Sequence, residues 1–301
     1  MLELKKENIA IPVVIVAGIL WSFGPLVVRH IDQPNLIPWQ YLCTRGVVIF
    51  CLLNFYLFLE EGKNFYKNYL HVGISGAIGG VGLGAAMITF IWSITQTTAA
   101  VTLLCLAGMP FITALLGFIF LKEQISINVW IAIIIATIGI IIMALGTLKS
   151  GTLIGLLFGL ASAVGFSIFS VTLRWRKETP KFTTVAIAGL FCFLFSLTVI
   201  IKNDLNFLST SKNESLFSLH GSLVCLGLIL YSIGSKVIPA AELTLLSLTE
   251  VIGGIFWVWL PFFGINETPS GSTIIGGFLI FISIFYYSLI IKTNRRFIGL
   301  N

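Results

Sequence analysis

Two ionisable residues, Arg45 and Glu250, lie inside long apolar stretches of the sequence and are its clearest candidates for chemistry. A charged group at membrane depth is costly, and it usually belongs to a solute path, a proton relay or an ion pair. At about 1.5 Å per helical residue, Arg45 lies roughly 12 Å from one membrane face and Glu250 roughly 15 Å from the other. These depths are similar within an apolar core about 30 Å thick. The two groups therefore either form a structural ion pair or face one central cavity.

Prolines near the middle of apolar segments add candidate binding residues. Pro25 has no N–H to donate to the carbonyl of Trp21, and Pro110 likewise frees the carbonyl of Leu106. A free carbonyl beside an indole can line a polar cavity, although a packed aromatic ring beside a kink fits the same pattern. Tyr231 fits either a cavity residue or core packing. The predicted solute-binding set is Trp21, Arg45, Glu250, Pro110 and Tyr231.

Other chemistry finds little support in the sequence. A carboxyl group at membrane depth can exchange a proton, which leaves proton coupling through Glu250 open. The histidines, His30, His71 and His220, fall near predicted helix ends without metal-ligand spacing, and the five cysteines form no CxxC pair. Residues 80–85 echo a dinucleotide fingerprint without its preceding strand, so their glycines indicate close helix packing instead. The sequence predicts no metal and no cofactor.

The composition places these residues in a membrane protein. Of 301 residues, 57% are hydrophobic and only 10% are charged, whereas a soluble domain carries about 25% charged residues. The mean hydropathy is +1.03. The net charge of +6 comes from basic residues scattered over loops, which is typical of membrane proteins and predicts no nucleic-acid partner. The first apolar segment lacks a cleavage site, and we interpret it as a retained helix.

Apolar segments of about twenty residues indicate transmembrane helices, because barrel strands are shorter and alternate strictly. The predicted all-α membrane fold has ten of them: 11–29, 37–59, 70–93, 97–121, 127–147, 151–173, 183–201, 218–238, 240–262 and 270–292. With the N-terminus inside, the only basic loop residues outside are Arg29, Lys149, Lys202 and Lys212. This bias predicts that both termini are cytoplasmic.

Two parts of the sequence run parallel. Residues 97–126 resemble residues 237–270, and Glu123 matches Glu267. The first copy ends at the predicted inner face and the second at the outer face, so two five-helix units would have inverted topology. Transporters commonly use this plan, with their site near the midplane. The predicted domains are residues 8–148 and residues 151–293.

Several of these residues lie in sequence motifs that are similar to those of a known protein family. Trp21 lies in LWSFGPLVVR, Arg45 lies in WQYLCTRGVVIF, and residues 99–126 read AAVTLLCLAGMPFITALLGFIFLKEQIS. Over nearly its whole length the chain resembles an EamA-type member of the drug/metabolite transporter superfamily. Glu250 matches a common family glutamate, but Val251 replaces the proline that usually follows it, and Lys122 replaces a glycine. The resemblance implies two inverted five-helix EamA-like repeats around a central cavity, and alternating access.

These observations predict a permease of the bacterial plasma membrane rather than an enzyme. One cationic and one anionic group at similar depth suit a zwitterion, which favours an amino acid or an amino-acid-derived compound as the solute. A nucleotide-derived or other larger metabolite or drug ranks lower, because a phosphate would favour several basic groups and Arg45 is the only one at depth. A structural subunit or a channel is a further alternative. A membrane-embedded lipid-modifying enzyme ranks lowest, since it would need clustered histidines or carboxylates.

Overall fold

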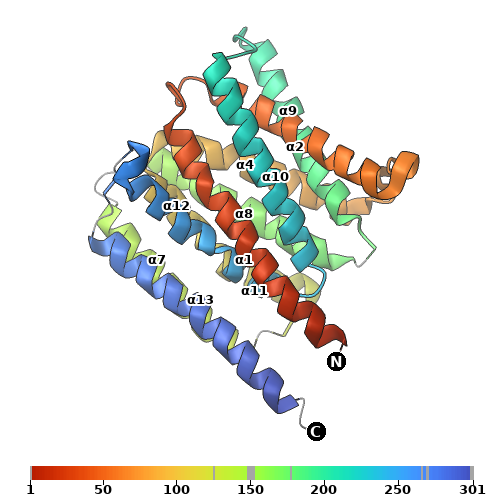
Figure 1. The fold of residues 1–301 in the computed structure, drawn as a ribbon, viewed down its shortest axis with the longest axis vertical. Helices are drawn as coiled ribbons and strands as arrows, with labels where there is room; N and C mark the ends of the chain where they lie inside the picture. Colours follow the sequence, from red (N-terminus) through yellow and green to blue (C-terminus); the bar gives the residue numbers. More distant parts are fainter. Residues whose placement is uncertain are drawn as a thin grey trace.

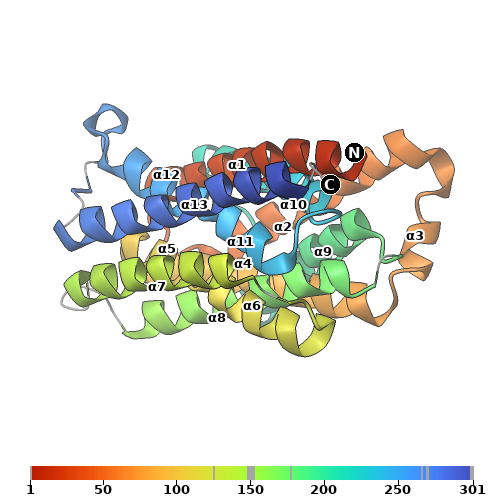
Figure 2. The ribbon, with the colours of Figure 1, turned by 90° about the horizontal axis from the view of Figure 1, so that it is seen from below.

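The computed structural model describes residues 2–124, 126–147, 153–176, 178–265, 267–268 and 271–298, and within these ranges every regular element is a helix (Figure 1). The long helices run roughly along one common direction (Figure 2). The beginning of α1 (Leu2–Arg29) and the end of α13 (Gly271–Ile298) lie at the same end of the bundle.

Among the described residues, eight helical segments are long and apolar enough to cross a membrane, and shorter apolar stretches lie within α7 (Ile127–Thr147) and α13. The chain is therefore a multi-pass membrane protein, while the count of ten spans stays a prediction. The eight segments are α1, α2 (Pro38–Glu61) with η1 (Gly62–Asn64), α4 (Gly73–Gln96), α5 (Ala99–Leu106) with α6 (Met109–Leu116) and η2 (Gly117–Leu121), α8 (Leu153–Trp175), α9 (Lys181–Lys202), α10 (Ser211–Gly234), and α11 (Ala240–Ser247) with α12 (Thr249–Trp259). The short helix α3 (Lys67–Leu70) lies between α2 and α4, and η3 (Pro261–Phe263) lies between α12 and α13.

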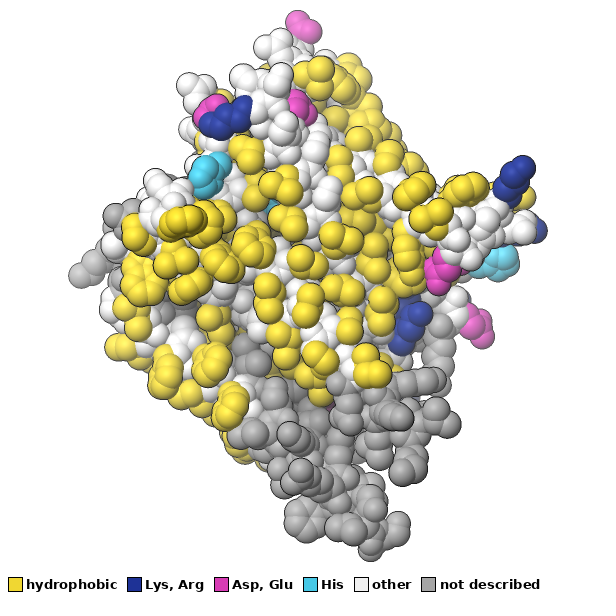
Figure 3. All heavy atoms as spheres, in the orientation of Figure 1, with side chains coloured by type: hydrophobic (Ala, Val, Ile, Leu, Met, Phe, Trp, Pro, Cys, Tyr) yellow, Lys and Arg dark blue, Asp and Glu magenta, His cyan; other side chains and the backbone are white. Residues whose placement is uncertain are grey.

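The outer surface of the bundle is apolar. Phe55, Phe118 and Phe278 are each more than half exposed. Hydrophobic atoms cover the middle of the face in Figure 3, and the charged side chains gather towards its edges. Hydrocarbon offers no partner for a free backbone group, so helices that close their own hydrogen bonds are the structure that this surface requires.

Two membrane-spanning segments are broken near their centres, where the sequence predicts continuous stretches. The first break lies between α5 and α6, and Pro110 occupies the first turn of α6, where a missing N–H has no cost. The second break, at Leu248 between α11 and α12, has no proline. Here the hydroxyls of Ser247 and Thr249 donate to the carbonyls of Thr244 and Leu246. Such bonds compete with the helix ladder and can bend it, which the apolar pattern alone does not show.

The start of α10 also differs from the sequence prediction. The helix begins at Ser211 rather than near residue 218, because the Thr210 hydroxyl accepts a hydrogen bond from the backbone N–H of Asn213. The acidic Glu214 in the first turn further suits a helix N-terminus. Because the helix starts earlier, His220 lies well inside it and not near a helix end as predicted.

Glycines bring neighbouring helices into close contact. Gly80 and Gly84 pack against Ile187 and Phe191 of α9, as the glycine pattern predicts. Helices from the two halves of the sequence pack against each other. In this way α1 contacts α10 and α12, α2 contacts α9 and α10, and α4 contacts α8 and α9. The helices α7 and α13 pack chiefly on each other at one side of the bundle (Figure 1).

The substitution Gly46→Ala should destabilise the crossing of α2 and α9. A methyl group at Gly46 would lie 2.6 Å from the backbone nitrogen of Phe193 and 2.8 Å from the carbonyl oxygen of Gly189, so the helices must separate. Overpacking typically costs about 1–3 kcal/mol. We expect a lower midpoint of thermal unfolding in detergent. Gly277→Ala is the matched control, because nothing lies within 4 Å of its added methyl group, and an unchanged midpoint for Gly46→Ala would contradict the close crossing.

Candidate functional site

A small cavity at the centre of the bundle collects the buried ionisable groups. Its volume is about 60 Å³, and α1, α2, α4, α5, α6, α8, α10 and α12 all contribute to its wall. The wall is mainly apolar, with Arg45, Ser162, His220 and Glu250 as its hydrophilic members. Ligand pockets usually measure about 300–1,000 Å³, so the cavity must widen to admit a metabolite.

Arg45 is the least satisfied group in this cavity. Its side chain comes from α2 and is only 4% exposed. Its Nε and Nη1 atoms are buried and have no hydrogen-bond partner among the residues that the structure describes. A buried charge is costly unless it is paired and hydrogen-bonded. The site therefore presents cationic donors that an anionic group could use.

Glu250 supplies a carboxylate on the same wall. It is the second residue of α12, directly after the break at Leu248, and is 9% exposed. A helix N-terminus favours a negative charge at this position. Within the described parts of the chain the salt bridges are Arg29–Glu267, Arg174–Glu123 and Lys212–Asp32, and none joins Arg45 to Glu250. Arg45 and Glu250 therefore line the same cavity without forming an ion pair with each other in the described structure.

His220 is a cavity residue that the sequence analysis missed. It is 2% exposed, and its Nδ1 atom shares a hydrogen bond with the hydroxyl of the fully buried Tyr41. Its Nε2 atom faces Gly24, where any side chain would collide with it. The signal that could have placed it is the Thr210 cap, which moves the start of α10 and so puts His220 at membrane depth.

The other predicted binding residues fall into two groups. Trp21 lines the cavity, and its Nε1 atom donates to the carbonyl of Val224 at 3.2 Å. Tyr231 is fully buried behind Trp21, with ring centroids 5.4 Å apart, and its hydroxyl lies 2.7 Å from that of Ser170. Pro110 is buried in α6 beside Met109, which does line the cavity. The structure thus brings Trp21, Arg45 and Glu250 together and places Tyr231 and Pro110 outside the wall.

Two arginines outside this cavity make matching sets of contacts. Arg29, at the end of α1, pairs with Glu267 at 2.5 Å and donates to the carbonyls of Ile94 and Thr97, at the turn between α4 and α5. We call this set the Arg29 clasp. It ties the end of α1 to the α4–α5 turn and to the segment that follows η3.

The second set, the Arg174 clasp, repeats this arrangement. Arg174, at the end of α8, pairs with Glu123 at 2.7 Å and donates to the carbonyls of Ser235 and Ile238, at the turn between α10 and α11. The sequence parallel already equates Glu123 with Glu267. The sequence indicates Arg29 only as a loop charge and gives no sign of the Arg174 contacts, because the partners of both arginines are distant in sequence.

Comparisons with known proteins agree with this architecture. Residues 8–145 match the model of the EamA-like transporter family. A Helicobacter pylori (strain J99 / ATCC 700824) protein described as an uncharacterized transporter is 25% identical over 182 residues, which cover 58% of this chain and 60% of that protein. The match thus spans less than two thirds of that relative.

A known crystal structure, described only as that of a protein, superposes on 94% of this chain and 97% of its own with a TM-score of 0.64. Its sequence identity is 17%, so it shows the fold alone. The resemblance predicted from the sequence motifs is confirmed for residues 8–145, which match the EamA-like transporter family.

Proposed function

We propose that the protein is a carrier that moves a small polar metabolite across the bacterial plasma membrane by alternating access, and that it is not an enzyme. The observation that carries the proposal is Arg45, a buried cation in a central cavity whose Nε and Nη1 atoms have no partner among the described residues. A carrier needs such a group at membrane depth to replace the water that an anionic solute loses. The EamA-like match and the transporter relative support the same conclusion.

The hydrophilic groups around the cavity favour a zwitterionic solute. Arg45 offers donors to a carboxylate, and Glu250 offers acceptors to an ammonium group. The separation of the two groups leaves each available to the solute, because no salt bridge joins them in the described structure. An amino acid or an amino-acid-derived compound meets both needs. A phosphate-bearing solute fits less well, since Arg45 is the only permanent cation among the described residues of the cavity wall.

We further propose that the chain consists of two inverted five-helix repeats, residues 8–148 and 151–293, with both termini cytoplasmic. If the two halves are exchanged, α1 takes the place of α8, α2 that of α9 and α4 that of α10. The packing is then preserved: the α1–α10 contact becomes the α8–α4 contact, and the α4–α9 contact becomes the α10–α2 contact. The two clasps and the two helix breaks correspond in the same way. Inverted repeats of this kind place a site between two alternating gates.

A ligand screen followed by transport tests the proposal. The purified protein is heated with a panel of amino acids and related compounds, and a true solute should raise the unfolding midpoint, because binding to the folded state stabilises it. The same compound should then exchange across liposomes in counterflow. The proposal fails if a stabilising compound shows no counterflow, or if only nucleotide-derived compounds stabilise the protein.

The substitution His220→Gln should weaken solute binding moderately. It replaces the imidazole with an amide whose donor and acceptor lie at other positions, so one hydrogen bond from the cavity wall to the solute is lost. Such a bond is worth about 0.5–1.5 kcal/mol, or up to about tenfold in affinity. Tyr41→Phe, which leaves the His220 ring in place, should have a smaller effect. His30→Gln is the control, because His30 is exposed outside the cavity. If all three variants bind the solute with the same affinity, His220 does not contribute to the binding site.

A further inference from the structure

We propose that the Arg29 clasp and the Arg174 clasp are the two gates of the carrier, each closing the central cavity towards one membrane face. This inference rests on the alternating access proposed above and assigns the residues that control it. The clasps tie α1, α4, α8 and the end of α10, and all four of these helices contribute to the cavity wall. The Arg29 clasp holds α1, the α4–α5 turn and the segment after α12, while the Arg174 clasp holds α8, the α10–α11 turn and the segment after η2.

A path from either face to the cavity requires the helices in one clasp to part. Trp21 of α1, Phe90 of α4 and Glu250 of α12 all line the cavity. The Arg29 clasp joins α1 to α4 directly, and it reaches α12 through Glu267, whose backbone N–H donates to the carbonyl of Val258. Phe166 of α8 and Val224 of α10 line it likewise, and their helices are joined by the Arg174 clasp. Each clasp therefore holds together helices from both halves of the sequence.

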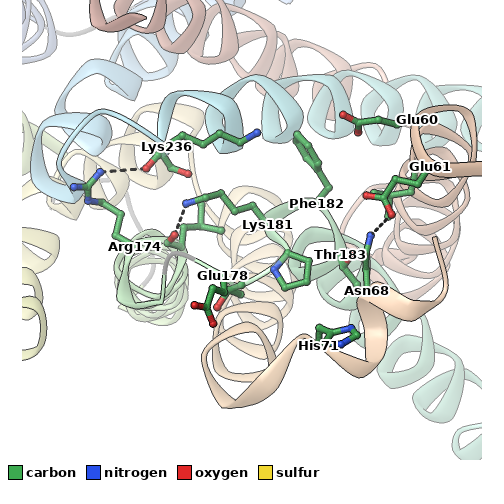
Figure 4. Close-up of a pocket in the computed structure, with 15 residues that line it drawn as sticks. Glu60, Glu61, Asn68, His71, Arg174, Glu178, Lys181, Phe182, Thr183 and Lys236 are labelled. Carbon is green, nitrogen blue, oxygen red and sulfur yellow. Dashed lines mark hydrogen bonds between the residues drawn. The ribbon is translucent and has the colours of Figure 1, made fainter. Parts of the chain in front are cut away.

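An open cavity leads up to the Arg174 clasp. Figure 4 shows this vestibule, which has a volume of about 820 Å³ and lies at the ends of α2, α8, α9 and α10. Arg174 and Ser235, which belong to the clasp, form part of its wall. A metabolite fits into this space, whereas the central cavity measures only about 60 Å³. The Arg174 clasp thus stands where a solute in the vestibule would meet the closed bundle.

The chemistry of the clasps suits a gate that opens repeatedly. Arg29 and Glu267 are 18% and 33% exposed at their side chains, and Arg174 and Glu123 are 25% and 21% exposed. Partly exposed ion pairs contribute little net stability, because water replaces them readily. In addition, both arginines bind backbone carbonyls at a turn, so parting the clasp frees groups that water can solvate. The matching contacts make the two closures similar in strength, which allows one to open while the other stays shut.

The test measures from which face the cavity becomes accessible. Ser162 lines the cavity, and Ser162→Cys, in a background with the native cysteines replaced, provides a thiol of nearly the same size. A membrane-impermeant thiol reagent is applied to right-side-out and to inverted vesicles, without any solute. Glu267→Gln should increase labelling several-fold from one face, and Glu123→Gln should increase it several-fold from the opposite face.

Opposite faces for the two variants support the gates, whichever way the protein sits in the bilayer. An increase from the same face for both, from both faces for each, or for neither variant overturns the proposal. Asp32→Asn is the matched control, because the exposed Lys212–Asp32 pair touches neither clasp, and it should leave labelling unchanged. Met87→Cys, which lines the cavity from α4 instead of α8, serves as a second reporter. Since no solute is present, a failed transport assay and a failed gate remain distinct results.

Discussion

Arg45→Ala is expected to abolish solute-induced stabilisation and transport while leaving the empty protein at least as stable as the parent. The Nε and Nη1 atoms of Arg45 are buried without a hydrogen-bond partner in the described part of the chain, so the empty protein gains little from the charge and bears the cost of desolvating it. A bound carboxylate would use these donors. Charge-assisted hydrogen bonds are worth about 1.5–3 kcal/mol each, so losing two or more of them should lower affinity by more than about a hundredfold.

The stability of the variant separates this role from a structural one. If Arg45 and Glu250 formed a buried ion pair, removing either partner would destabilise the protein by about 3–5 kcal/mol. The double variant Arg45→Ala/Glu250→Gln would then recover part of the loss. We expect instead that neither substitution lowers the thermal unfolding midpoint of the empty protein. Arg176→Ala, which removes an exposed arginine just after α8, should keep both binding and transport.

The sequence predicts the centre of the site because charge at membrane depth is rare. Arg45 and Glu250 stand out against a chain with 10% charged residues, and the structure brings both to one cavity together with Trp21. Hydrophobicity and position alone carry that information. Tyr231 has the same sequence signal as a cavity residue but packs behind Trp21, since the apolar pattern of α10 does not say which of its faces meets the cavity.

Contacts between residues far apart in the sequence could not be predicted from the sequence alone. The partners in the Arg29 clasp lie 238 positions apart, so a count of loop charges records Arg29 only as a cation near a helix end. The break at Leu248 depends on hydroxyl groups that donate to local carbonyls, and serines and threonines do so in many unbroken helices. His220 was misplaced because its helix begins with a polar turn that resembles a loop.

Glu250→Gln is expected to remove transport driven by a pH gradient, and this is the sharpest test of proton coupling. We propose Glu250 as the coupling group because it is the only carboxylate in the wall of the central cavity, within the part of the chain that the structure describes. Glutamine keeps the shape and the hydrogen-bonding capacity of the residue but cannot take up or release a proton. A carrier that returns across the membrane with a proton on Glu250 would therefore lose net, gradient-driven movement.

Two assays on the same liposomes distinguish coupling from solute binding. If Glu250 serves only to couple protons, Glu250→Gln should retain counterflow of the identified solute while accumulation under an imposed pH gradient disappears. If the carboxylate also binds the ammonium group of the solute, counterflow should fall as well, by about ten- to hundredfold in affinity for a lost charged hydrogen bond. Asp204→Asn, which neutralises an exposed carboxylate after α9, should leave both assays unchanged. Full gradient-driven accumulation by Glu250→Gln would rule out this residue as the coupling group, because no proton could then reside on it during the cycle.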